Sequence, residues 1–165
     1  MNQMPAALER LRFAIHTLPG ILSRFSEAES EHRPSPERWS KKEVLGHLID
    51  SAANNHQRFV HAQFTDDLMF ADYEQDQWVS TQKYRDESWP DVIDLWSSYN
   101  LHLLHVVSVI PEDVLTKTRA QHTLDEIAFK DLDKNEPATL EFLIRDYVDH
   151  LHHHLNQIFT EVEKH

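Results

Sequence analysis

The chain has no cysteine and only two glycines among its 165 residues. Without thiols it forms no disulfide, iron–sulfur cluster or zinc ribbon, and any metal site has to use nitrogen and oxygen ligands. Any chemistry at sulfur therefore requires an imported thiol. With so little glycine, phosphate-cradling loops of the Walker or dinucleotide-binding type are excluded as well, which removes most nucleotide-dependent enzymes.

Basic residues and long apolar runs are scarce too. The formal net charge is −12 and no basic stripe is present, so we expect no nucleic-acid partner. No segment approaches the roughly 18 continuous apolar residues of a membrane span, and residues 1–20 lack the pattern of a signal peptide. With 40% hydrophobic residues, the sequence predicts one cytoplasmic domain over residues 1–165, with a small-molecule partner and no membrane partner.

Apolar residues recur at the three-four spacing of amphipathic helices in four long segments, with no strong strand pattern between them. Pro19 and Gly20 are expected to kink or interrupt the first segment. The second begins with a capping-box pattern, in which the side chains of Ser40 and Glu43 each bind the other's backbone amide. Together the segments predict an all-α four-helix bundle. They cover residues 8–25, about 41–63, 88–110 and about 138–163.

The segments between these helices carry prolines and charges and are predicted to be irregular. Residues 27–38 have the composition of a charged loop. Residues 65–86 are acidic, aromatic and weakly periodic, so mostly loop is expected there. Within residues 112–136 we expect a helical turn at PEDVL, residues 111–115, and a short extended piece over 123–129.

Four of the 13 histidines lie in HLHHHL, residues 150–155, inside the fourth helix. Because about one pair at i, i+4 is expected by chance in this composition, spacing alone is weak evidence for a metal site. At about 100° per residue, His150 and His154 lie on the same flank of the apolar stripe, so both imidazoles can converge on one ion. His152 and His153 point elsewhere and are expected on the outer surface.

Two histidines are too few for a metal site, so a third ligand has to come from another helix. In the second helix, His47 lies beside the apolar stripe, on the same side as Asn54 and Arg58. The helix pattern alone favours a hydrogen-bonded boundary histidine at position 47. It leaves open a three-histidine site with water at the remaining position.

Two longer patches add to this pattern. The first patch, residues 39–59, reads WSKKEVLGHLIDSAANNHQRF and contains a Trp-Ser start, a His-Leu-x-Asp block and a downstream Arg. The second, residues 139–158, reads TLEFLIRDYVDHLHHHLNQI and contains His-x-x-x-His followed by Gln-Ile. Both resemble the DinB-like superfamily of metal-binding four-helix proteins, which includes bacillithiol-dependent and other low-molecular-weight thiol transferases. The resemblance implies that the ligands of a divalent ion such as zinc or nickel are His47, His150 and His154.

Three neutral imidazoles leave a bound divalent ion its full charge, so a bound water or an added thiol becomes a nucleophile at neutral pH. Water gives hydrolysis, whereas a low-molecular-weight thiol as co-substrate gives transfer onto a small electrophile, which the resemblance favours. The alternatives are a non-catalytic metal-binding or stress-associated interaction module, which could form a homodimer through an exposed helix face, and a bundle without metal.

No catalytic residue is assigned beyond the metal centre itself. Asp50 and Asp146, each one helical turn from a proposed ligand, are candidates to orient the histidine rings, although solvated helix charges explain them as well. Arg58 and Asn54 are candidates to bind the substrate, and a structural ion pair is an equal explanation of Arg58.

Overall fold

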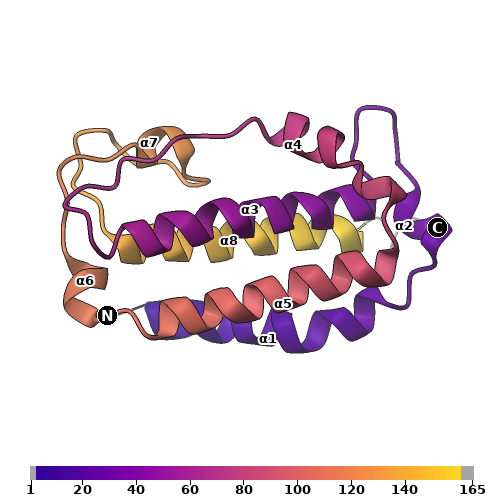
Figure 1. Cartoon of the computed structure of the whole chain (residues 1–165), viewed down its shortest axis with the longest axis horizontal. Coiled ribbons are helices and arrows are strands. Elements are labelled where there is room, and N and C mark those ends of the chain that lie inside the picture. The colour runs from indigo at the N-terminus through magenta and orange to yellow at the C-terminus, as the bar shows by residue number, and fades with distance from the viewer. Residues whose placement is uncertain (1–2, 161–165) are drawn as a thin grey trace.

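Four long helices run side by side along the length of the molecule (Figure 1). The computed structural model describes residues 3–160, and within that range it contains helices but no strand. α3 packs against α5 and α8, and α1 packs against the same two helices. This arrangement confirms the predicted all-α four-helix bundle. The long helices are α1 (Met4–Leu22), α3 (Lys41–His61), α5 (Trp89–Ser108) and α8 (Leu140–Thr160).

The helix ends follow local sequence signals at some points and tertiary contacts at others. At the start of α3, Glu43 N–H donates to Ser40 Oγ at 3.2 Å and Ser40 N–H donates to Glu43 Oε2 at 2.9 Å, which is the predicted capping box. Of the two effects predicted for Pro19 and Gly20, a kink or an interruption, the interruption does not occur, because α1 continues through both residues. Pro19 lies in the last turns, and full burial of Leu22 in the core holds the helix together there.

The connecting segments contain more helix than predicted. Residues 27–38 and 65–86 are not simply loops, because short helices lie within both. A second capping box, formed by Ser26 and Glu29, starts one of them, and the others pack against α3. Such short helices depend on tertiary contacts, which apolar periodicity does not reveal. They are α2 (Glu27–Glu31), α4 (Gln75–Gln82) and the 3₁₀ helix η1 (Tyr84–Asp86).

The last connection confirms one prediction and corrects another. α6 (Glu112–Thr116) is the expected helical turn, whereas the predicted extended piece over 123–129 contains α7 (Leu124–Ile127). The side chain of Leu124 is fully buried and anchors this turn to the bundle. None of the helices within residues 3–160 combines the length and apolar character needed to cross a membrane.

Gly46 allows η1 to lie directly on α3. A Cβ at this position would lie 2.2 Å from Cδ2 of Tyr84, far inside van der Waals contact. The Tyr84 hydroxyl donates to Asp50 Oδ1 at 2.7 Å, which holds the ring against the helix. Gly46, which directly precedes His47, therefore sets the distance between α3 and the segment that precedes α5.

Candidate metal centre

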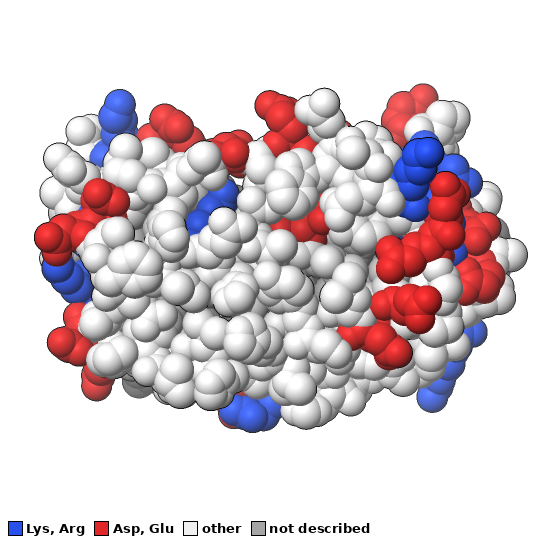
Figure 2. All heavy atoms as spheres, in the orientation of Figure 1, with Lys and Arg blue, Asp and Glu red and all other residues white. Residues whose placement is uncertain are grey.

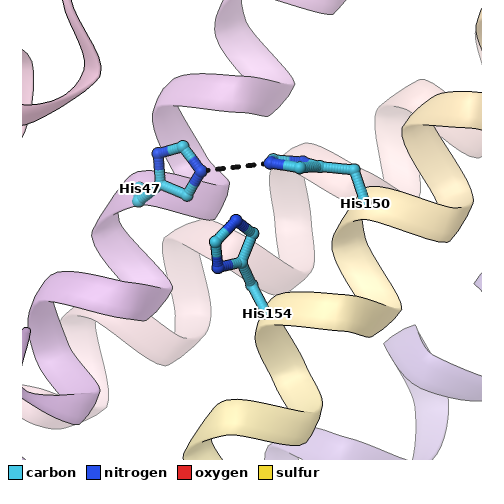
Figure 3. Close-up of side chains that lie close together, drawn as sticks. All are labelled: His47, His150 and His154. Atoms are coloured by element: carbon cyan, nitrogen blue, oxygen red, sulfur yellow. Dashed lines mark hydrogen bonds between the residues drawn. The ribbon is translucent and has the colours of Figure 1, made fainter. Parts of the chain in front are cut away.

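Packing of α3 against α8 brings together the three histidines that the sequence singled out (Figure 3). His47 lies near the start of α3, and His150 and His154 are one turn apart on α8. Nε2 of His47 is 3.2 Å from Nε2 of His150, and one nitrogen from each of the three rings lies within 4.8 Å of the others. The ring centroids are 4.5–5.1 Å apart.

Burial keeps these imidazoles neutral. It lowers the pKa of His47 to about 3, helped by the charges that His154 and His150 would carry. It lowers the pKa of His150 to about 3 as well, and it lowers the pKa of His154. A neutral imidazole is the form that binds a metal ion.

The spacing of the nitrogens fits a metal ion. Two imidazole nitrogens about 2.0–2.1 Å from a tetrahedral zinc ion lie about 3.4 Å apart, close to the observed 3.2 Å. Nδ1 of His154 is 2.9 Å from Oε1 of Gln157, which only accepts, so Nδ1 carries the proton and Nε2 keeps its lone pair. Within residues 3–160, buried Nδ1 of His47 has no hydrogen-bond partner. The donor set therefore suits a divalent ion with imidazole ligands.

A cavity of about 270 Å³ opens beside His150 and His154. A second recess of about 320 Å³ also borders His154, together with Gln157 and Trp39. The Trp39 ring lies 5.0 Å from the His47 ring and covers it. Besides His150, His153 and His154, the polar residues that line the first cavity are Ser51, Asn55, Arg58, Asp72, Tyr73, Gln75, Glu126, Asp146 and Tyr147.

Arg58 is a buried cation in the wall of this cavity, with 7% of its surface exposed. Its Nη2 donates to the Ala71 carbonyl at 2.8 Å. Among the residues that the structure describes, no carboxylate forms an ion pair with it, although Asp72 lines the same cavity. Burial lowers the pKa of Arg58, against the attraction of Tyr73 and Asp72. The structural ion pair that the sequence offered as an equal explanation of Arg58 is therefore not present in the described structure, and the guanidinium retains N–H groups for a ligand.

The three other predicted residues have partners different from those expected. Asp146 accepts from the backbone N–H groups of Phe129 and Lys130 at 2.8 and 2.7 Å, so it anchors the loop after α7 and does not orient a histidine. Asp50 accepts from Tyr84 and Gln82, and no bond from it to a histidine occurs in the described chain. The side-chain amide of Asn54 donates to the Asp50 carbonyl at 2.9 Å and lies outside the histidine cavity.

Gln157 and Phe129 also contact the histidine cluster, although neither is among the predicted site residues. Gln157 follows His154 by three residues on the same helix flank, a signal that was present in the sequence. Phe129 comes from an irregular loop, and its ring lies 5.6 Å from His150 and 5.0 Å from His153. His153 is exposed as predicted but lines the cavity, whereas His152 is half-buried and its Nδ1 contacts the Val148 carbonyl at 2.9 Å.

Known proteins share this architecture. A family model described as the DinB superfamily matches residues 10–158. A solved structure, YfiT from Bacillus subtilis, described as a probable metal-dependent hydrolase with an unusual four-helix bundle topology, aligns with a TM-score of 0.78. The two chains are 18% identical, and the alignment covers 98% of this chain and 86% of YfiT. No curated protein matches the sequence.

Proposed function

Since this chain belongs to the DinB superfamily, we propose that His47, His150 and His154 hold a divalent metal ion in a metal-dependent hydrolase of small molecules. The observation that carries the proposal is the convergence of three neutral imidazoles beside a cavity of about 270 Å³. Imidazole ligands suit zinc or nickel better than magnesium or calcium. The description of YfiT as a probable metal-dependent hydrolase supports the reaction type.

The side chains around the cluster have separate roles in this proposal. A divalent ion held by His47, His150 and His154 would lower the pKa of a water molecule or thiol, which would make either one nucleophilic at neutral pH. Gln157 orients His154, and Trp39 and Phe129 shield the rings of His47 and His150 from bulk water. The ligands are held by packed helices, so little reorganisation is needed on binding.

A second candidate function is transfer of a low-molecular-weight thiol onto a small electrophile. It is favoured by the two recesses that border His154, because two reactants need space on the same ion. The chain has no cysteine of its own, so the thiol would be a co-substrate.

Arg58 supports an anionic substrate in either reaction. The guanidinium is buried in the cavity wall and is free of a carboxylate partner within the described residues. A substrate carboxylate or phosphate would supply the missing charge and form charge-assisted hydrogen bonds. We therefore propose that the substrate carries such a group and that this group binds Arg58 in the cavity wall.

The test uses metal-stripped protein reloaded with zinc or nickel and a panel of activated esters and electrophiles, each in a neutral and a carboxylate form, with and without added thiols. Turnover is expected to rise in proportion to metal content, with a preference for the anionic form that falls about tenfold or more in Arg58→Gln. Ester loss without thiol indicates hydrolysis, and thiol consumption indicates transfer. Bound metal without turnover of any kind would favour a non-catalytic metal-binding module.

Replacing Gln157 with leucine is expected to weaken metal binding about 10–100-fold, since the Nδ1 proton of His154 loses its acceptor and the ring loses its orientation. The affinity is measured by competition with a chromogenic chelator. Gln157→Glu keeps an acceptor and should retain binding. The matched control is Asn156→Ala, which changes the exposed residue next to Gln157. Equal affinities of Gln157→Leu and the wild type would argue against this role.

A further inference from the structure

A second group of histidines lies on the outer face of the bundle, between α3 and α5. His56 belongs to α3, and His102 and His105 belong to α5. The rings of His56 and His102 are 5.1 Å apart, and those of His102 and His105 are 6.3 Å apart. These residues are separate from those that line the cavity at the metal centre. The function proposed above does not use them.

The geometry of this outer group resembles that of a metal site in part. The separation of His56 and His102, 5.1 Å, equals that of His47 and His150. Nδ1 of His56 is 3.1 Å from the Tyr99 hydroxyl, which holds the ring and leaves Nε2 for another partner. Two residues three apart on a helix lie on neighbouring turns of one face, so the rings of His102 and His105 can reach the same point.

The outer group is not preassembled, in contrast to the metal centre. Among His, Asp and Glu side chains within residues 3–160, only His47, His150 and His154 bring three potential ligand atoms within 4.8 Å of one another. The outer histidines do not meet this distance. His102 and His105 are exposed, so their rings are free to rotate toward His56. Ordering these side chains costs entropy, and we expect weaker binding than at the metal centre.

The surroundings of the outer group select the kind of ion. Residues 95–111 contain no charged side chain, and the only one in residues 51–65 is Arg58, which is buried. Figure 2 shows a broad area without charged side chains over the middle of the molecule, where α3 and α5 lie in Figure 1. Magnesium and calcium require oxygen ligands, preferably carboxylates, whereas neutral imidazoles favour zinc, nickel and copper.

We propose that His56, His102 and His105 form a second, solvent-facing site for a transition-metal ion. Two imidazoles already lie at the separation found in the metal centre, and a third is one helical turn away. The ion would be reached directly from solvent, so it should exchange faster than an ion held at His47, which is fully buried. The chain would then carry two metal ions of different affinity.

The experiment titrates metal-stripped, untagged protein with Ni²⁺ or Zn²⁺ alone and measures the heat of binding. The wild type is expected to bind two ions, and His102→Ala/His105→Ala is expected to lose only the weaker one, with at least about a tenfold fall in its affinity. His47→Ala should lose the tighter ion and keep the weaker one. His16→Ala removes an exposed histidine from α1 and serves as the control.

An unchanged number and affinity of ions in His102→Ala/His105→Ala would overturn the proposal. A second measurement on the wild type avoids the variants altogether. Paramagnetic Cu²⁺, added after the metal centre is filled with zinc, should broaden the NMR signals of His56, His102 and His105 first. Broadening elsewhere, with these three unaffected, would also contradict the outer site. Both results are independent of whether the buried metal centre is catalytic.

Discussion

Replacing His47 with alanine is expected to abolish stoichiometric binding at the buried metal centre and to lower metal-dependent turnover by more than about 100-fold. His47 is the ligand from α3, so its loss leaves only the two nitrogens of α8. Elemental analysis of the untagged protein, after dialysis against a weak chelator that removes weakly held ions from the outer histidines, and the rate of ester or thiol consumption measure the two effects. His150→Ala should behave in the same way, because it removes the nitrogen 3.2 Å from that of His47.

The matched control is His152→Ala, which removes a neighbouring histidine of the same helix. The Nδ1 of His152 contacts the Val148 carbonyl one turn earlier, so this variant should keep both metal and activity. The metal-free His47→Ala protein should melt below the metal-free wild type but still fold cooperatively, because removal of the unpartnered buried nitrogen offsets only part of the packing lost with the fully buried ring. Near-stoichiometric metal at the buried centre in both His47→Ala and His150→Ala would refute the three-histidine assignment.

Replacing Gly46 with alanine is expected to lower the free energy of unfolding by about 1–3 kcal/mol or more. Alanine is favoured over glycine inside a helix by about 1 kcal/mol, so propensity alone predicts the opposite sign. The clash decides the result, because the new Cβ would lie 2.2 Å from the Tyr84 ring. Relief requires η1 to move away from α3, which also breaks the hydrogen bond from Tyr84 to Asp50.

Gly20→Ala is the matched control for this prediction. Gly20 also lies inside a helix, but in the described structure a Cβ there would meet no heavy atom within 4 Å. This variant should be as stable as the wild type or more stable by up to about 1 kcal/mol. Urea unfolding of the three proteins measures the differences. Equal midpoints for Gly46→Ala and Gly20→Ala would show that the close approach of Tyr84 does not limit stability.

The carboxylates show why part of the site escaped prediction. Asp50 and Asp146 are each one turn from a proposed ligand, so helix geometry alone made them candidates to orient histidines. Their observed partners are Tyr84 and the backbone of Phe129 and Lys130. These partners lie in connecting segments without apolar periodicity, so their positions were not accessible from the sequence. Gln157 was accessible, since it shares a helix flank with His154.

The long helices, and the direction in which each histidine leaves its helix, follow from the amino-acid sequence alone. Both depend on a local repeat of 3.6 residues per turn, and the capping box of Ser40 and Glu43 is equally local. Helical geometry is therefore sufficient to separate His150 and His154 from the other two histidines of the cluster. Helix packing decides that the flank of α8 with His150 and His154 faces His47. This packing involves side chains distant in sequence and is visible only in the folded molecule. The same packing placed Arg58 in the cavity wall and left His102 and His105 exposed to solvent.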